Sequence, residues 1–193
     1  YDLLLVKIKA VAAGELTSTI FTFSPSEIYG KTAWTAAELG VSAVIADGAF
    51  TSEALQAIGT TLTFSSKTAV EALLADCPYE LYWFDKTTPY STSYPQYTAN
   101  SSTQTITLVG NVTIRMVVSS DYRTSAYVIN ASYGTSVSAA LDRASQIVKT
   151  YASSSNYDKL MAYKTEICSL VSYNLSAAYG GSAYGNPWQL VWV

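Results

Sequence analysis

The sequence contains no histidine. This absence excludes the imidazole base of serine and cysteine hydrolases, histidine metal ligands and imidazole proton shuttles from these 193 residues. Cysteine is scarce as well, because two thiols are too few for a four-thiolate zinc site. The acidic residues form no dense, glycine-containing loop of the kind that binds calcium. We therefore predict neither a metal site nor a cofactor.

Charged side chains are also few, at 13% of residues against roughly 25% in an ordinary soluble domain. The 11 basic and 14 acidic residues give a net charge of −3, which leaves no basic excess to neutralise phosphates. We therefore expect no nucleic-acid partner. The sequence has no apolar run long enough to cross a bilayer, which takes about 20 residues, so we expect no membrane span.

Hydroxyl groups take the place of the missing charges. The chain has 25 serines, 22 threonines and 16 tyrosines. A surface solvated through hydrogen bonds rather than ion pairs favours an extracellular or cell-surface location. The first residue is Tyr1 rather than methionine, which agrees with an exported protein whose signal peptide has been removed.

The first 77 residues are predicted to form a small helical module. Thr35 and Glu38 have the spacing of a capping box, in which each side chain satisfies a backbone N–H at the start of a helix. A β-prone run separates the first helix from the rest at residues 17–23. Helical spacing or capping residues mark four segments: 2–13, 34–40, 52–58 and 68–75.

The character of the sequence changes at Pro78, where β-prone residues begin. Residues 79–84 are predicted to form a strand, and 85–102 a loop rich in Ser, Thr and Tyr. Residues 103–119 are rich in Val, Ile and Thr, which indicates strand structure. Gly110-Asn111 either closes a hairpin there or lies within one long bent strand; the sequence leaves both open.

Two amphipathic helices are predicted after the strands, at residues 136–152 and 157–173. Leu160, Ile167 and Leu170 are expected to line a buried face of the second. The fold class is therefore α+β: an N-terminal helical module, a central antiparallel β segment and two C-terminal helices. The predicted parts are residues 1–77 and 78–193, with one compact unit as the alternative.

Two stretches resemble bacterial surface proteins that carry a transglutaminase-like domain. Residues 75–83, ADCPYELYW, resemble a turn that precedes a β-rich segment in those proteins. Residues 157–174, followed by GNPWQ at 185–189, resemble the helix and linker that lead to the catalytic cysteine of that domain. The order and spacing of these motifs make the resemblance more specific than each motif alone, and it covers about residues 75–193.

The resemblance implies thiol acyl transfer or hydrolysis in a papain-like fold by a cysteine, a histidine and an aspartate. In the family the nucleophile lies beyond the Pro-Trp segment, whereas this chain stops at Val193. We therefore expect no catalytic residue here, and a scaffolding role for a catalytic domain downstream. Cys168 is not a match for the nucleophile, because it lies inside a predicted helix rather than at its start.

The two cysteines, Cys77 and Cys168, have two possible arrangements. A disulfide between them would suit an exported protein. Alternatively, they are two small buried thiols.

Aromatic residues suggest a second class of function. Tyr and Trp combine an apolar ring with a polar tip, which suits stacking on sugar rings or on a partner protein. The alternative is that these rings belong to the core or to a long loop. The candidate binding residues are Tyr82, Trp83, Tyr90, Tyr94, Tyr97 and Trp188. They define the alternative function, a self-sufficient surface module that binds carbohydrate or protein.

The C-terminal residues 188–193, WQLVWV, are too apolar to remain uncovered in water. Burying each large apolar side chain yields about 1.5–3 kcal/mol. We therefore expect this tail to fold back on the core or to contact a second copy.

Overall fold

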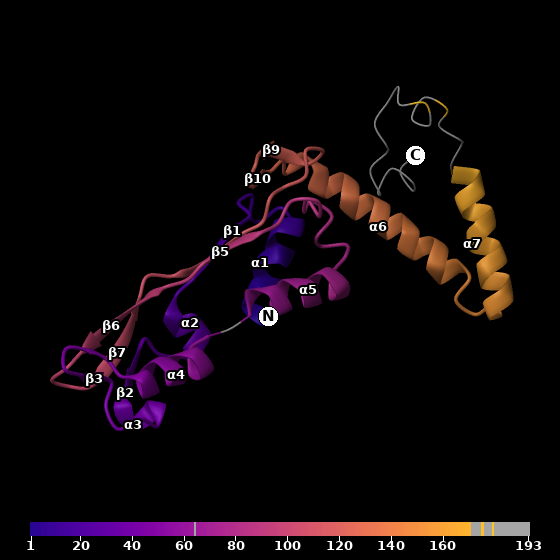
Figure 1. The fold of residues 1–193 in the computed structure, drawn as a ribbon. Coiled ribbons are helices and arrows are strands. Elements are labelled where there is room, and N and C mark those ends of the chain that lie inside the picture. The colour runs from indigo at the N-terminus through magenta and orange to yellow at the C-terminus, as the bar shows by residue number, and fades with distance from the viewer. Residues whose placement is uncertain (64, 171–174, 176–178, 180–193) are drawn as a thin grey trace.

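The computed structural model describes residues 1–63, 65–170, 175 and 179 (Figure 1). The chain has an α+β fold in which the strands are antiparallel. The helices are α1 (Asp2–Ala12), α2 (Pro25–Tyr29), α3 (Ala36–Leu39), α4 (Ser52–Thr61), α5 (Ser66–Asp76), α6 (Ser132–Thr150) and α7 (Asn156–Leu170). The strands are β1 (Ile20–Phe23), β2 (Ala33–Thr35), β3 (Ile45–Ala46), β4 (Ala49–Phe50), β5 (Ser91–Ser93), β6 (Gln96–Asn100), β7 (Thr105–Val109), β8 (Val112–Arg115), β9 (Arg123–Ser125) and β10 (Val128–Ile129).

A long bent ribbon of two antiparallel strands organises the molecule. Strand β6 pairs with β7, and further along the same ribbon β5 pairs with β8. The ribbon bends at Gly110, whose backbone φ of 91° is in the region that glycine adopts readily. Strands β7 and β8 therefore lie end to end instead of pairing. Of the two alternatives left open by the sequence, the bent strand is correct and the hairpin at Gly110-Asn111 is wrong.

Each half of the ribbon becomes a three-stranded sheet by taking a strand from the N-terminal part of the chain. Strand β1 pairs with β8 in the order β1-β8-β5, and β2 pairs with β7 in the order β2-β7-β6. The predicted boundary between residues 1–77 and 78–193 consequently runs through both sheets. Each sheet takes one strand from the first part of the chain and two from the second.

The first core lies between the sheet β1-β8-β5 and helices α1 and α5. Helix α1 is amphipathic as predicted. Alternation along β1 and β8 turns every second residue inward. The buried contributors are Leu4, Ile8 and Val11 from α1, Val70 and Leu73 from α5, Phe21 and Phe23 from β1, and Val112 and Ile114 from β8.

The second core lies under the sheet β2-β7-β6. Trp34 on β2 is paired directly with Ile106 on β7, and both are buried against helices α3 and α4. The capping box predicted at the start of α3 is confirmed: the Thr35 hydroxyl accepts from the Glu38 N–H, and the Glu38 carboxylate accepts from the Thr35 N–H. Helix α3 is thereby fixed immediately after β2.

The strand predicted at residues 79–84 is wrong, because most of this segment forms turns. The N–H of Leu81 donates to the Cys77 carbonyl, and the N–H of Tyr82 donates to the Tyr79 carbonyl. These local bonds use the groups that a strand would offer to a neighbour. The turns bury Leu81 and Trp83 in the first core instead.

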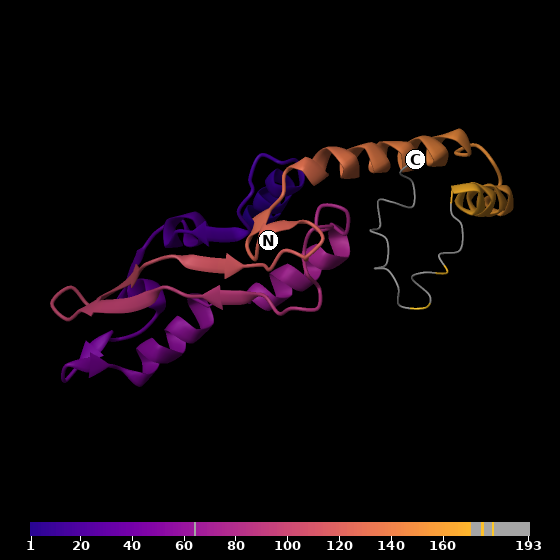
Figure 2. The same ribbon diagram turned by 90° about the horizontal axis from the view of Figure 1, so that it is seen from above.

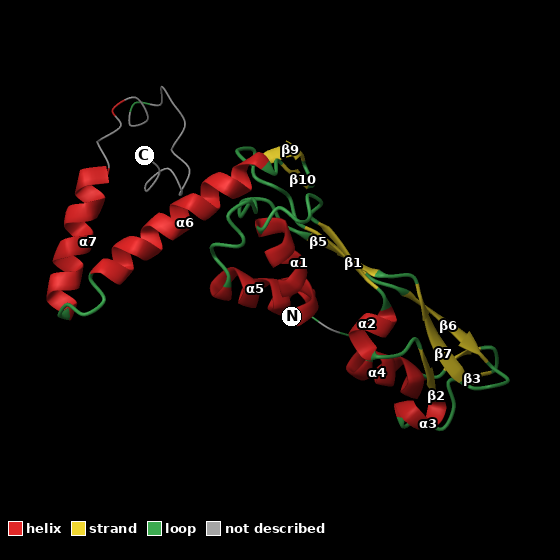
Figure 3. Cartoon of the chain, turned by 180° about the vertical axis from the view of Figure 1, so that it is seen from behind, coloured by secondary structure: helices red, strands yellow, loops and turns green. Residues whose placement is uncertain are grey.

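Helices α6 and α7 form a hairpin that projects from the body (Figures 1 and 2). Viewed from behind, the strands lie in the body and the projecting part is helical (Figure 3). On α6, Val137 and Ala140 are buried at the end nearest the body. None of residues 156–170 in α7 is buried; Leu160 is 69% exposed and Ile167 46%. The predicted buried face of this helix is therefore wrong.

Within the described ranges, every helix is too short or too polar to cross a membrane. The predicted cover for the apolar tail concerns residues 188–193, which lie outside the described residues.

Candidate functional site

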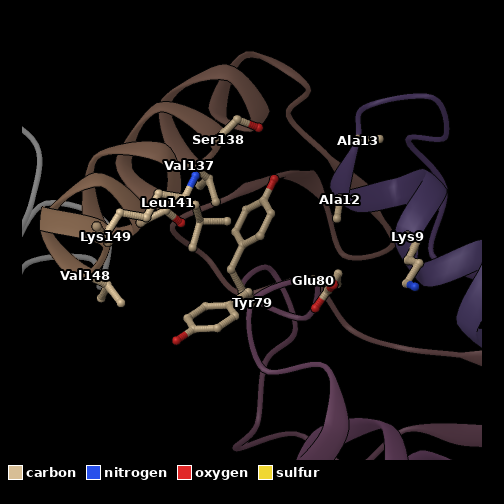
Figure 4. Close-up of a pocket in the computed structure, with 13 residues that line it drawn as sticks. Lys9, Ala12, Ala13, Tyr79, Glu80, Val137, Ser138, Leu141, Val148 and Lys149 are labelled. Atoms are coloured by element: carbon tan, nitrogen blue, oxygen red, sulfur yellow. The ribbon is translucent and has the colours of Figure 1, made fainter. Parts of the chain in front are cut away.

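A cleft of about 660 Å³ lies where the hairpin leaves the body (Figure 4). One wall is the end of α1, with Ala12 and the following Ala13. The opposite wall is α6, which contributes Val137, Leu141 and Val148 from one side of the helix. Small side chains on α1 and larger aliphatic ones on α6 leave an open space with a largely apolar lining.

The turn after α5 provides the floor of the cleft. Its local hydrogen bonds bring Tyr79, Glu80 and Tyr82 to the cleft between the two walls. The Tyr82 ring lies edge-to-face with Tyr122, with 5.1 Å between ring centroids. The Tyr82 hydroxyl is buried and has no hydrogen-bond partner among the described residues. This burial, together with the nearby Tyr122, raises the pKa of Tyr82 to about 12.

Charged groups stand on different elements around this cleft. Lys9 comes from α1, Lys149 from α6 and Glu80 from the turn between them (Figure 4). The lining residues that the structure describes include neither cysteine nor histidine. The arrangement therefore suits binding of an apolar group more than nucleophilic catalysis.

The predicted aromatic residues do not form one binding surface. Trp83 has 0% exposure and packs against Phe84, with ring centroids 6.3 Å apart, so it has no ring face to offer a ligand. Its assignment as a binding residue is wrong. Tyr90 is half-buried against the first core.

Two of the predicted rings remain at the surface. Tyr94 is 54% exposed, and Tyr97 on β6 is 39% exposed. Trp188 lies outside the described residues. The sequence interpretation missed Tyr29, which lies close enough to these two tyrosines for them to raise its pKa, although burial is the larger cause.

Tyr29 is held firmly in this position. Its hydroxyl donates to the Leu62 carbonyl at 2.6 Å, and its ring meets Trp34 edge-to-face at 5.6 Å. No local sequence pattern indicates that Tyr29 lies near Tyr94, because the two residues come from separate segments of the chain. The α6 wall of the cleft, by contrast, was indicated by the apolar stripe of that helix.

The two cysteines are separate and both are free thiols. Cys77 is buried at the end of α5, whereas Cys168 is exposed on α7 in the projecting hairpin (Figure 1). The predicted disulfide is therefore not formed. The alternative of two buried thiols is wrong for Cys168, because α7 buries none of its described residues.

Two acidic residues near the turn, Asp76 and Asp85, have hydrogen-bond partners. Asp76 accepts a hydrogen bond from the Tyr1 hydroxyl at 2.7 Å, which is the main reason that the pKa of Tyr1 rises to about 12. Asp85 accepts from the hydroxyls of Thr87 and Thr88, and these bonds lower the pKa of its carboxyl. In the described part of the chain, no three acidic or thiol groups gather as a metal site would require.

We compared the chain with protein-family models, with curated proteins and with solved structures, and found no match. Its function must therefore be argued from its own residues.

Proposed function

We propose that the chain is the non-catalytic scaffold of an exported bacterial transglutaminase-like protein, whose thiol acyl-transfer or hydrolysis site is formed by residues beyond Val193. The observation that carries this proposal is the α6–α7 hairpin, which projects from the body with an apolar face that the described residues leave exposed. Such a face is a surface for further polypeptide to pack against.

The hairpin has a defined inner side. At the end of α6, the Tyr151 hydroxyl donates to the Glu166 carboxylate at 2.9 Å. The rings of Tyr151 and Tyr163 meet edge-to-face at 6.0 Å. Because these contacts hold one side of α7 toward α6, the side chains of Leu160 and Ile167 are left on the exterior.

Covering this exterior face would be favourable. A Leu or Ile side chain gains about 1.5–3 kcal/mol when it is fully buried. Residues 157–174 are also those that resemble the helix leading to the catalytic cysteine in transglutaminase-like domains. The exposed face thus belongs to the segment that the resemblance puts next to the catalytic part.

The chemistry of the chain also supports a scaffold whose catalytic residues lie elsewhere in the polypeptide. A thiol acyl-transfer site needs a cysteine with a neighbouring base, and the sequence has no histidine. Cys77 is buried in the first core, and Cys168 lies far from the first turn of α7, where the helix dipole would favour a thiolate. In this proposal the nucleophile and its base therefore come from other residues.

The proposal is tested by comparing this chain with a longer polypeptide that continues past Val193. We expect the chain alone to turn over neither amide nor ester, and the longer polypeptide to do so through a new Cys–His pair. Leu160→Asp in the longer polypeptide should lower its activity at least tenfold by disturbing the packing of α7. Ser169→Asp, at an exposed position on another side of α7, is the matched control and should have little effect.

Two results would contradict the proposal. One is turnover by the 193-residue chain itself, which would place the active site within it. The other is a continuation of the polypeptide that contains no Cys–His pair.

A second candidate function, surface binding of carbohydrate or protein, is favoured by the exposure of Tyr94 and Tyr97. The test is binding to a glycan array and to peptide ligands. Tyr94→Ala or Tyr97→Ala should abolish any signal, whereas Tyr157→Ala, which removes an exposed ring on α7, should not. Binding that persists in both variants would exclude this surface.

A further inference from the structure

Strand β6 lies at an edge of the sheet β2-β7-β6. All five of its residues, Gln96–Asn100, are exposed. One side of the strand pairs with β7, and no described strand pairs with the other side. In Figures 1 and 3 this edge faces away from the rest of the molecule. Its outward backbone groups are therefore available to another strand.

Edge strands of soluble proteins usually carry a feature that prevents such pairing, such as a charge, an internal proline or a bulge. The sequence of β6, QYTAN, has neither a charge nor a proline. Its register with β7 is unbroken over five residue pairs, from Gln96 opposite Val109 to Asn100 opposite Thr105. The strand is thus regular and lacks the usual protection.

We propose that β6 pairs antiparallel with β6 of a second copy of this chain, which joins the two sheets across a two-fold axis. Another extended polypeptide can pair with all the outward backbone N–H and C=O groups of an edge strand at once, in place of the water that otherwise solvates them. A two-fold axis requires the same surface on both copies to be complementary to itself. Strand β6 meets this requirement when Thr98 lies on the axis.

The side chains match in this register. Thr98 faces Thr98 of the second copy, a pairing that is favourable between neighbouring strands. The large ring of Tyr97 faces the small side chain of Ala99, and the amide of Gln96 faces that of Asn100. No like charges are brought together, since the strand has none. Tyr97 is 39% exposed at the edge, so its ring can extend over the added strand.

The contact involves few residues, which determines how the dimer should behave. A five-residue strand pair buries less than the roughly 1,200 Å² of a standard stable interface. We therefore expect a reversible dimer with a Kd between about 10 μM and 1 mM. This dimer is independent of the proposed scaffolding function, because it uses β6 rather than the α6–α7 hairpin.

The test is sedimentation velocity of the full chain from 5 μM to 2 mM. We expect a monomer at the lowest concentration and a dimer at the highest. Thr98→Lys and Thr98→Glu should each raise Kd at least tenfold, because each places two like charges at the axis. An equal mixture of the two variants should recover a dimer, since lysine then faces glutamate.

Thr98→Val is the matched control, because it keeps a β-branched, uncharged side chain and should dimerise like the original protein. Thermal melts establish that each variant is folded. They also measure how much stability is lost with the hydrogen bond that the Thr98 hydroxyl donates to the Thr107 carbonyl. The proposal is overturned by a monomer at 2 mM, by charged variants that dimerise normally, or by failure of the mixture to associate. It is also overturned if Leu160→Asp dissociates the dimer while Thr98→Lys does not.

Discussion

The body of the molecule and the α6–α7 hairpin use amphipathic helices differently. In the body, α1 and α5 place their apolar residues against a sheet, and Ile8 and Leu73 have no exposed surface. In the hairpin, α7 leaves Leu160 and Ile167 exposed, although they recur on one side of the helix as core residues do. Apolar periodicity thus identifies the face of a helix that gains from cover, but not what covers it.

The difference arises from the bent ribbon. Strands β7 and β8 carry alternate buried residues into two different cores, so the helices of the body have an apolar surface to pack on. Helix α6 touches this structure at its first turns, through Val137 and Ala140, and then runs away from it. Among the described residues, α7 alone packs against the part of α6 that lies far from the body.

The largest effect should come from removing a buried leucine in the body. Leu73→Ala leaves a cavity in the first core and should lower the free energy of unfolding by about 2–5 kcal/mol. Leu160→Ala makes the same chemical change on α7 and should cost less than about 0.5 kcal/mol. Urea unfolding of both variants measures the difference. Equal losses would mean that Leu160 is covered in solution, and the contrast between body and hairpin would not hold.

The next effect concerns a polar link within the body. The Gln104 Oε1 atom accepts from the N–H groups of Val44 and Ile45 at 2.6 and 2.9 Å, and its Nε2 donates to the Ile45 carbonyl. Gln104→Ala leaves these groups unpaired and should cost about 1–3 kcal/mol in chemical unfolding.

Gln96→Ala is the control for Gln104→Ala, because it removes the same side chain from an exposed position on β6 and should cost less than about 0.5 kcal/mol. Hydrogen exchange should also increase at residues 44 and 45 in Gln104→Ala. If both variants lose the same stability, the second core does not depend on this link.

A smaller effect is expected where the body meets the hairpin. Tyr82→Phe removes a buried hydroxyl that has no hydrogen-bond partner among the described residues, so it should change stability by less than about 1 kcal/mol at neutral pH, in the stabilising direction. The pKa of Tyr82 is raised from 10.0 in the unfolded chain to about 12 in the folded protein, because burial disfavours the phenolate. The unfolded state therefore releases this proton first, so the free energy of unfolding does not change with pH through this group below pH 10 and falls as the pH rises from 10 through 12.

Unfolding of the two proteins between pH 9 and 12 distinguishes them. The original protein should lose more stability over this interval than Tyr82→Phe. Identical alkaline curves would show that the Tyr82 hydroxyl is solvated, and that the cleft opens further to water than the structure indicates.

The smallest effect is expected at the surface of the body. The pKa of Glu38 is lowered from 4.5 to about 2, first by a hydrogen bond from Lys31 at 2.6 Å and then by the Thr35 N–H. A lowered pKa means that this stabilising contribution is present above pH 4.5 and is lost as the pH falls through 2. Lys31→Gln should move the pKa of Glu38 upward in an NMR titration. High salt should weaken the ion pair and produce a similar shift.

Local sequence patterns predicted much of the body. The spacing in α1, the capping box at α3 and the apolar stripe of α5 depend on neighbouring residues, and all are present. The strand expected at residues 79–84 failed because turn hydrogen bonds within the segment replaced pairing with a neighbour. Aromatic and β-branched composition indicates burial as much as strand geometry, and here burial was the correct inference.

The candidate site was predicted less well, since it depends on contacts between distant segments. Tyr82 was identified as a candidate, and it does line the cleft. Trp83, its neighbour in sequence, points into the core instead. Composition does not distinguish two adjacent aromatic residues, whereas the turn that carries them directs one toward the cleft and the other inward.

The sequence by itself determined the chemical limits of this protein and the positions of most of its helices. Without histidine it holds no thiol–imidazole pair, and its helical spacing and caps act over a few residues. Tertiary structure alone decided the path of residues 105–115 through two sheets, the separation of Cys77 from Cys168 and the exposure of α7. These outcomes depend on which distant surfaces meet, and an amphipathic pattern specifies the need for a partner surface but not its identity.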